Sequence, residues 1–312
     1  MTMPVLEVEG LSISFTQYDK GVRQRSLPVI RDLDLTIRPG QVVAVVGSSG
    51  SGKSLLAHGI LGILPYNARQ SGSIRYRGEP LTPRRAEELR GREIVLIPQS
   101  VGYLDPLMQV GPQIRKGRRD PASRARSREI LGRYHLGSEV EALYPFELSG
   151  GMTRRVLIST AVVEAPSLVI ADEPTPGLDP RSLHHIMDHF REIADSGAGL
   201  LLITHDLEAA LAIADRVAVF YAGETIEEAP ALDFAAEETL RHPYTRALWR
   251  AMPQHGFQPI PGAQPYPGAA RQGCPFLPRC PRRTAECGSA VPYRPVEGGF
   301  VRCLHPERGA EA

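Results

Sequence analysis

The chain of 312 residues has little net charge and no long apolar run. Its formal net charge is +1, so composition does not favour nucleic acid as the main partner. No stretch approaches the roughly 20 continuous apolar residues of a membrane span. The amino terminus also lacks the basic and then apolar pattern of a secretion signal. We therefore expect a cytoplasmic protein that reaches a membrane only by docking on an embedded partner.

Lysine and cysteine are both scarce. Lysine occurs only as Lys20, Lys53 and Lys116, and arginine supplies the other cations. Cysteine is absent until the last forty residues, which hold all four cysteines, Cys274, Cys280, Cys287 and Cys303. In a reducing cytoplasm, clustered cysteines more often ligate a metal or a cluster than form disulfides.

Hydrophobic patterning predicts an α/β fold. Segments 5–15 and 32–37 alternate with period two, whereas 41–46, 167–172 and 199–204 are continuous apolar runs typical of buried strands. Helical segments separate these runs, which favours a sheet with parallel central strands. Residues 80–165 are expected to be mainly helical. We expect a domain over 1–228 and a separate, loop-rich, proline-rich and cysteine-containing appendage over 229–312.

The segment from Gly47 to Ser54 reads G-S-S-G-S-G-K-S and fits the P-loop pattern. Its glycines let backbone N–H groups point at phosphate oxygens, and the following helix adds the positive end of its dipole. Lysine supplies charge to the β- and γ-phosphates, and the final serine places a hydroxyl on Mg²⁺. The predicted nucleotide-binding residues are Gly47, Ser48, Ser49, Gly50, Ser51, Gly52, Lys53 and Ser54.

Two acidic residues lie at the end of the buried run 167–172. Asp172 is its last residue, and Glu173 follows it. Asp172 can hold Mg²⁺ through water, and Glu173 can polarise the water that attacks the γ-phosphate. Acids in such places are often only helix caps. After a P-loop in an open α/β sheet, however, the carboxyl end of a strand lies beside the phosphates.

With these motifs and LSGGM at 148–152, the chain resembles the ATP-binding cassette (ABC) superfamily. The resemblance covers about residues 5 to 230. It implies a P-loop NTPase cassette with a mixed-sheet core and a helical subdomain. It also implies that Ser149, Gly150 and Gly151 contact ATP held on a second cassette. Met152 departs from the usual glutamine of this signature, which puts the strength of that contact in doubt.

Further landmarks carry roles by the same resemblance. Gln99 matches the glutamine that senses Mg²⁺, His205 matches the histidine at the γ-phosphate, and 177–180 resembles the loop that crosses the dimer interface. Phe15 is the expected adenine-stacking aromatic, with Tyr18 as the alternative, although Phe15 could equally pack in the core. The expected catalytic set is Lys53, Gln99, Glu173 and His205, and the expected Mg²⁺ set is Ser54, Gln99 and Asp172.

The appendage resembles the oligopeptide, dipeptide and nickel importer branch through HPYTRAL at 242–248 and GCPFLPRCP at 273–281. In that branch the tail cysteines can ligate an iron–sulfur cluster. Four thiolates suit a 4Fe–4S cluster as well as zinc, although structural zinc sites usually begin with closer pairs. We therefore expect a cluster first, zinc second and unligated thiols third.

These resemblances predict an ATPase subunit that powers import of a peptide-like or other small solute, including a nickel or metal chelate. The expected partners are two permease subunits, a second ABC ATPase (as a heterodimer before a homodimer) and, indirectly, an extracytoplasmic solute-binding protein. The expected location is the cytoplasmic face of the inner membrane. The alternative is a non-transport ABC ATPase acting on nucleic acid or the ribosome. The basic stretch 115–128 favours a solvated helical face over a lipid or permease contact. The sequence does not identify the cargo.

Overall fold

The structure is a computed structural model that describes residues 3–18, 21–265 and 272–307. Its strands form two sheets among these residues, one of four strands in the order β2-β1-β4-β5 and one of eight in the order β11-β12-β10-β9-β3-β8-β7-β6. The strands are β1 (Leu6–Tyr18), β2 (Gln24–Ile37), β3 (Val42–Val46), β4 (Ala68–Tyr76), β5 (Glu79–Pro80), β6 (Ile94–Ile97), β7 (Leu168–Asp172), β8 (Gly199–Thr204), β9 (Arg216–Tyr221), β10 (Glu224–Pro230), β11 (Arg294–Val296) and β12 (Gly299–Val301).

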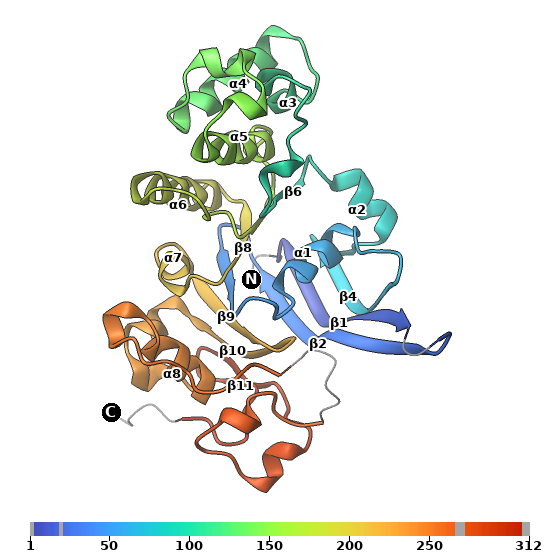
Figure 1. Ribbon diagram of the computed structural model, residues 1–312, viewed down its shortest axis with the longest axis vertical. Helices are drawn as coiled ribbons and strands as arrows, with labels where there is room; N and C mark the ends of the chain where they lie inside the picture. Colours follow the sequence, from blue (N-terminus) through green and yellow to red (C-terminus); the bar gives the residue numbers. More distant parts are fainter. Residues whose placement is uncertain (1–2, 19–20, 266–271, 308–312) are drawn as a thin grey trace.

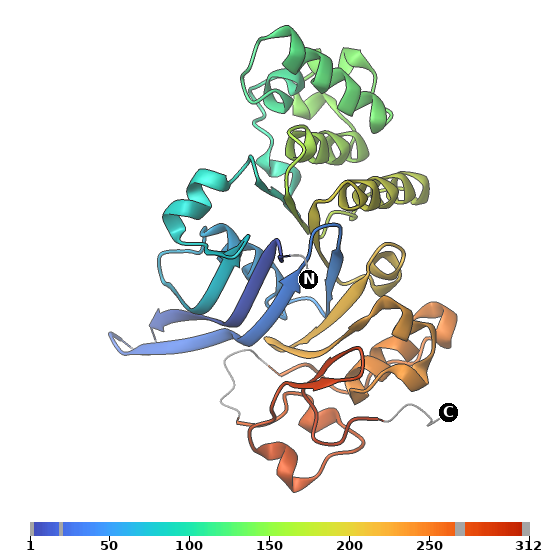
Figure 2. The same ribbon diagram turned by 180° about the vertical axis from the view of Figure 1, so that it is seen from behind.

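Helices connect and cover these strands (Figures 1 and 2). The α-helices are α1 (Lys53–Leu61), α2 (Pro83–Leu89), α3 (Val110–Ile114), α4 (Pro121–Arg133), α5 (Gly150–Val162), α6 (Pro180–Asp195), α7 (Leu207–Leu211) and α8 (Pro243–Arg250). Short 3₁₀ turns are η1 (Val101–Tyr103), η2 (Ser138–Ala142), η3 (Pro145–Glu147), η4 (Ala231–Ala235), η5 (Glu237–Thr239), η6 (Pro253–His255), η7 (Leu277–Arg279) and η8 (Ala285–Gly288). None of the helices in the described ranges is long and apolar enough to cross a bilayer.

The larger sheet is mixed, as predicted. Strands β9, β3, β8, β7 and β6 pair in parallel, whereas β10 and β12 add antiparallel strands at one side. The runs that read as buried strands are β3, β7 and β8, and all three are fully buried. The helical region 80–165 contains one strand, β6, which the sequence analysis did not separate from its surroundings.

Alternating side chains of β3 enter two different hydrophobic cores, because successive residues of a strand face opposite sides of the sheet. Val42, Ala44 and Val46 pack with α6 and α8. Val43 and Val45 pack with α1 and the antiparallel sheet. A third core lies within α3, α4 and α5, which we call the helical lobe. The lobe forms the upper end of the molecule in both ribbon views, with the smaller sheet and β10 below it.

The tail, the appendage predicted over 229–312, is less separate than the sequence predicted. Its hairpin β11–β12 extends the larger sheet through pairing of β12 with β10. The carboxylate of Glu227 in β10 is fully buried and accepts the backbone N–H of Arg241 at 2.8 Å and of His242 at 2.7 Å. That carboxylate therefore holds the segment that leads into α8. The sequence did not predict this pairing, because strands of three residues are too short to show the alternation of apolar and polar residues.

The basic stretch 115–128 is partly paired within the lobe. The guanidinium of Arg115 lies 2.8 Å from Glu141, that of Arg118 lies 3.0 Å from Glu164, and that of Arg128 lies 3.5 Å from Glu141. Residues 115–120 lie between α3 and α4, and the Arg115 side chain is only 13% exposed, so the interpretation as a solvated helical face fits only 121–128 in α4.

A buried histidine joins the lobe to α6. His189 of α6 is 5% exposed, and its Nδ1 hydrogen-bonds the hydroxyl of Tyr134, which follows α4. Burial, assisted by the charge of Arg133, lowers the pKa of His189 to about 4. The imidazole is therefore neutral in the folded protein at pH 7.

This burial predicts an acid sensitivity. An unfolded histidine titrates near 6.5, so below that pH the unfolded chain binds a proton that the folded chain rejects. Its stabilising contribution is complete above pH 6.5 and falls as the pH drops toward 4, by about 3 kcal/mol in total. The substitution His189→Gln should make the free energy of unfolding, measured by urea titration at pH 7 and pH 4.5, less dependent on pH.

The exposed His184 on the same helix provides the control. His184→Gln should leave the pH dependence as it is in the wild type. An identical fall in stability for wild type and His189→Gln would show that His189 does not cause the acid sensitivity.

Candidate nucleotide-binding and hydrolysis site

The predicted site residues follow neighbouring strands of the larger sheet. The strand order β3-β8-β7-β6 places the P-loop after β3, His205 after β8, Asp172 and Glu173 at the end of β7, and Gln99 beyond β6 (Figure 1). Because these strands are parallel, their carboxyl ends lie along one edge. That edge is where ligands bind in open α/β sheets.

Three glycines of the P-loop are required by geometry. A Cβ on Gly47 would lie 2.2 Å from the carbonyl oxygen of Phe220 in β9, so the loop begins directly against a neighbouring backbone. Gly50 and Gly52 have φ of 75° and 100°, which side-chain-bearing residues rarely adopt. Gly52 is also the residue that caps α1. The loop can therefore turn its backbone toward a ligand at the start of that helix.

Lys53 is buried beneath the loop, with 6% of its surface exposed. Its Nζ donates to the carbonyl of Gly47 at 2.7 Å and to that of Ser48 at 3.0 Å. Burial lowers the pKa of this amine, while the charges of Glu173 and Asp172 oppose that effect. The ammonium is thus held at the loop by carbonyl dipoles and faces two carboxylates, an arrangement suited to receiving an anionic ligand.

Ser54 and Asp172 already form one oxygen pair. The Ser54 hydroxyl donates to Oδ1 of Asp172 at 3.1 Å, across α1 and β7. Burial raises the pKa of Asp172, and the bond from Ser54 opposes this rise. A hydroxyl and a buried carboxylate are hard oxygen donors of the kind that Mg²⁺ takes together with phosphate oxygens. The residues present therefore fit the metal that the resemblance implies.

Glu173 and His205 also lie together. Nδ1 of His205 is 2.8 Å from Oε2 of Glu173, whose side chain is buried while the histidine remains mostly exposed. The backbone of Glu173 has φ of 46°, and its N–H donates to the carbonyl of Ile203 at 2.8 Å. A left-handed non-glycine residue costs energy, and such residues gather at functional sites. The turn at Glu173 directs its carboxylate to His205, which directly follows the neighbouring strand β8.

Gln99 is exposed beyond β6. Its carbonyl accepts Nη2 of Arg154 at 2.5 Å, and the carbonyl of Pro98 accepts Nη1 at 2.9 Å. Arg154 is 5% exposed and belongs to α5, and burial lowers its pKa. Sequence reasoning missed this residue, because a charged position on a helix normally predicts a solvated face. The guanidinium joins the helix of LSGGM to the glutamine segment.

The LSGGM segment lies elsewhere. Ser149 caps α5, where its Oγ accepts the N–H of Met152 at 3.3 Å, and Gly150 begins the helix. In Figure 1 this helix belongs to the lobe, away from α1 and the P-loop. The structure therefore brings together Lys53, Ser54, Asp172, Glu173 and His205, but not the signature serine and glycines.

The two aromatic candidates differ in their surroundings. Phe15 of β1 is half-buried and packs against the core beside α1, with Leu27 and Ala68 opposite it on neighbouring strands. Tyr18 is 70% exposed, and its hydroxyl accepts Nε2 of Gln24 at 3.3 Å. The packing interpretation of Phe15 thus has support, and its role toward adenine stays a prediction.

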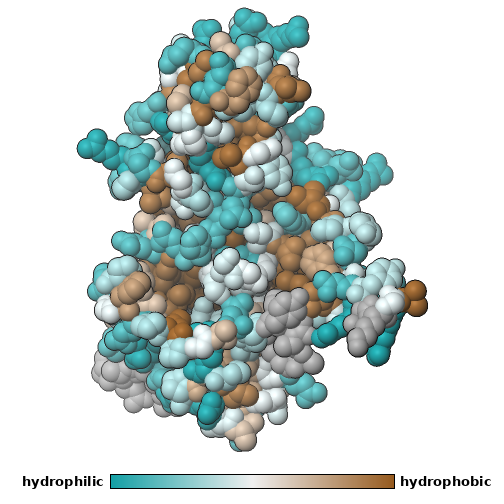
Figure 3. Space-filling model, in the orientation of Figure 1, coloured by the Kyte–Doolittle hydropathy of each residue, from teal (hydrophilic) through white to brown (hydrophobic). Residues whose placement is uncertain are grey.

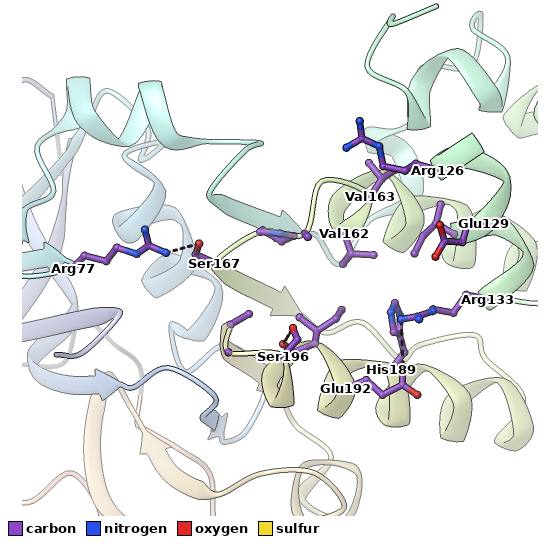
Figure 4. A pocket seen from close by; sticks show the side chains of 16 residues that line it. Arg77, Arg126, Glu129, Arg133, Val162, Val163, Ser167, His189, Glu192 and Ser196 are labelled. Carbon is purple, nitrogen blue, oxygen red and sulfur yellow. Dashed lines mark hydrogen bonds and ion pairs between the residues drawn. The ribbon is translucent and has the colours of Figure 1, made fainter. Parts of the chain in front are cut away.

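A second pocket lies at the other ends of the strands. Ser167, directly before β7, accepts Nη2 of Arg77 at 2.7 Å, and the carboxyl ends of α5 and α6 complete the wall with Arg126 and Arg133 (Figure 4). Because Asp172 is at the opposite end of β7, this pocket is not the nucleotide site.

All four cysteines line one pocket in the tail, together with His242 and His305. Burial raises the pKa of Cys274 and of Cys303 to about 11, and the neighbouring thiols add to this shift. Within the described ranges, however, no three His, Cys, Asp or Glu side chains are arranged to hold a metal ion. The fold thus gathers the thiols at one place without setting them in a ligand geometry.

Comparisons with known proteins agree with this arrangement. The family described as ABC transporter matches residues 30–176, and the family described as oligopeptide/dipeptide transporter, C-terminal region, matches residues 226–287. A Brucella abortus protein, provisionally named a peptide import ATP-binding protein, is 35% identical over 97% of this chain and 95% of its own length. The oligopeptide transport ATP-binding protein OppD of Salmonella typhimurium is 34% identical over 97% of this chain and 94% of its own.

Solved structures show the same cassette fold. An ATP-binding subunit of an ABC transporter is 26% identical, has a TM-score of 0.61 and covers 74% of this chain and 91% of its own. A dimeric bacterial ABC transporter cassette, 22% identical, has a TM-score of 0.63 over 72% of this chain and 98% of its own. The fold and its P-loop edge define an ATPase of the cassette class. The chain belongs to the ABC transporter family, as an ATP-binding subunit.

The Glu173–His205 pair yields a direct test. The substitution Glu173→Gln keeps the size of the side chain but removes the basic oxygen, so ATP turnover should fall by about a hundredfold or more. ATP binding should persist, because the P-loop is unchanged. Steady-state turnover and equilibrium binding of labelled ATP measure the two separately.

The control is Glu164→Gln, which alters only the surface partner of Arg118. Its turnover should match that of the wild type. Turnover near the wild-type rate in Glu173→Gln would place the catalytic carboxylate elsewhere.

Proposed function

We propose that this chain is the ATP-hydrolysing subunit that powers import of a peptide-like or other small solute through a membrane permease. The observation that carries the proposal is the combination of a cassette site with a tail of the oligopeptide/dipeptide transporter type. Two relatives that align with this chain over nearly their whole length are named for peptide import and for oligopeptide transport. We divide the chain into a nucleotide-binding domain at 1–228, with a helical subdomain at 80–165, and a tail at 229–312.

Within the site, each side chain has a proposed role. The P-loop, residues 47–54, binds the phosphates of ATP through backbone N–H groups, and Lys53 places its charge on the β- and γ-phosphates. Glu173 holds and polarises the attacking water, and His205 orients that carboxylate and contacts the γ-phosphate. Ser54, Asp172 and Gln99 would hold Mg²⁺, which when bound neutralises charge on the phosphates. Phe15 would stack on adenine.

A second cassette chain is proposed to complete the site. Ser149, Gly150 and Gly151 present free backbone N–H groups at the start of α5, but they lie apart from the P-loop of their own chain. This separation supports the proposal that they serve ATP on a partner, and a cassette of the same fold is dimeric. We propose a heterodimer, in which Met152 stands where an amide would contact the partner's nucleotide.

The permease is proposed to dock beside the glutamine segment. Large apolar side chains are exposed after Gln99, at Val101, Tyr103, Leu107 and Met108, and Phe146 is 72% exposed before the signature. The two segments are joined, since the N–H of Val110 donates to the carbonyl of Leu143 at 2.9 Å. Figure 3 shows apolar surface over the lobe among hydrophilic atoms. Clusters of exposed apolar side chains mark interaction surfaces. Docking of a permease here would place the chain at the cytoplasmic face of the plasma membrane.

A purification from native membranes tests this function. Full-length tagged chain, recovered in mild detergent, should bring with it two permease subunits and a second cassette ATPase, identified by mass spectrometry. Leu107→Glu, which places a charge on this apolar surface, should lose the permeases, whereas Leu232→Glu, at an exposed tail position, should keep them. Recovery of only a second copy of this chain would replace the heterodimer with a homodimer. Recovery of only ribosomal or DNA-bound proteins would reject transport.

We also propose that the four cysteines hold a 4Fe–4S cluster that fastens the tail. The support is their shared pocket and their burial, which makes free thiolates unfavourable there. A cluster would supply the compensating charge and join the cysteine segments to one another.

Chemical analysis tests the cluster. Full-length protein purified without oxygen should contain about four iron and four sulfide per chain. Cys287→Ser should lose most of both, whereas Ser289→Ala, an exposed tail substitution, should lose neither. Zinc without sulfide would replace the cluster with a zinc site. Absence of all these elements would leave the thiols unligated.

A further inference from the structure

Arg154 of α5 holds the backbone on both sides of Gln99. Its Nη1 donates to the carbonyl of Pro98 at 2.9 Å, and its Nη2 donates to the carbonyl of Gln99 at 2.5 Å. The first carbonyl belongs to the peptide unit before the Cα of Gln99, and the second belongs to the unit after it. Because peptide units are planar, φ and ψ are the only soft torsions between these two units. The guanidinium therefore restricts both torsions of Gln99 and the direction of its Cα–Cβ bond.

The chain on either side of Gln99 is also anchored. Ile97 ends β6 and pairs with Ala171 of β7, one residue before Asp172. After the glutamine, the hydroxyl of Ser100 caps the short turn η1. Gln99 itself is exposed, so core packing does not orient its side chain. The two bonds from Arg154 fix the backbone at this exposed residue.

Arg154 occupies a costly position for a residue that would only hold its helix in place. It is 5% exposed, and its Nε has no hydrogen-bond partner in the part of the chain that the structure describes. A buried donor without a partner destabilises a folded protein. Apolar residues of similar volume often replace a buried charge without loss of stability. The guanidinium is therefore explained by what it holds, the two carbonyls beside Gln99.

A side chain that is already held near its binding geometry loses less conformational entropy when it binds. Groups that orient metal ligands accordingly contribute to metal affinity. We propose, on the basis of the Mg²⁺ role proposed for Gln99, that Arg154 is a positioning residue that holds Gln99 ready for Mg²⁺ and so sets the Mg²⁺ affinity of its own chain's nucleotide site. The signature helix then serves this site through Arg154, in addition to the contact proposed for its amino terminus with ATP on a partner.

A Mg²⁺ titration of nucleotide binding measures this role without turnover. The probe is a labelled, non-hydrolysable ATP analogue with a β,γ-imido bridge, bound to the full-length protein. Arg154→Gln should raise the Mg²⁺ concentration for half-maximal binding by about tenfold, the lower end of the effect of losing a group that orients a metal ligand. Binding in EDTA should be unchanged, because the P-loop keeps its contacts. Arg154→Lys, whose ammonium lacks the planar fork of the guanidinium, should give an intermediate shift.

The matched control is Arg115→Gln. Arg115 is another shielded arginine of the lobe, with a side chain 13% exposed and 2.8 Å from Glu141. Loss of this ion pair should lower the temperature of thermal unfolding but leave the Mg²⁺ titration at the wild-type value. Amide hydrogen exchange across 99–102 should quicken in Arg154→Gln and not in Arg115→Gln. Equal shifts of the Mg²⁺ titration in both variants would overturn the positioning role, because general stability of the lobe would then account for them.

A double-mutant cycle with Gln99→Ala separates the positioning role from the metal role. Gln99→Ala alone should shift the Mg²⁺ titration, and Arg154→Gln should add nothing in that background, since both act through one side chain. A shift in Gln99→Ala with none in Arg154→Gln or Arg154→Lys would overturn the positioning role alone. So would equal shifts from Arg154→Gln with and without the glutamine. No shift in Gln99→Ala would overturn the Mg²⁺ role proposed for Gln99, and the positioning role with it.

Discussion

Parallel pairing of β3 between β8 and β9 is the constraint on which the site depends. The register sets Val46 beside Thr204 on one side and beside Val219 on the other, so β3 and β8 end level with one another. In a buried parallel strand the register cannot slip without misplacing every apolar side chain. The P-loop and His205 are consequently fixed by hydrophobic packing in the interior. The packing of the core therefore fixes the positions of the site residues at the edge of the sheet.

The same sheet carries the tail. β10 pairs with β9, β12 pairs with β10, and the buried carboxylate of Glu227 holds the entry to α8. The guanidinium of Arg302, also in the tail, donates to the carboxylate of Asp32 in β2 at 3.2 Å. A segment with little core of its own is thereby attached to both sheets. This attachment explains how Gln264, 216 positions after Ser48, can contact the Ser48 side chain.

Patterns of short range predicted most of the fold and the site. Continuous apolar runs gave β3, β7 and β8 nearly to the residue, because a fully buried strand tolerates few polar side chains. The P-loop could be predicted because its glycines are required by the local backbone conformation. Gly52, for example, has φ of 100°. Proximity of Ser54 to Asp172 and of Glu173 to His205 also followed, since motifs at the ends of parallel strands must share one edge.

What could not be predicted depends on contacts between distant segments. Arg154 resembles any arginine on an exposed helix, and only the fold shows that it is buried against two carbonyls. Gln264 lies in a proline-rich stretch without periodicity, so its approach to the P-loop leaves no local signal. The strand β6 is four residues long within a helical region, and it is placed only by pairing with β7. Sequence patterns reflect the residues that are near one another along the chain. The contacts that place Arg154, Gln264 and β6 are made with distant segments, so no local pattern reveals them.

Arg154 also bears on how two sites in one chain can act together. The start of α5 is proposed to serve ATP on a partner, whereas Gln99 is proposed to hold Mg²⁺ in the site of its own chain. The Arg154 guanidinium donates to the carbonyls of Pro98 and Gln99 from α5. Breaking either bond would leave a buried charge with fewer partners, which is costly. If α5 moves when it meets a partner's nucleotide as proposed, these two bonds would move the glutamine segment with it, and the proposed contact and the proposed Mg²⁺ ligand of this chain would change together.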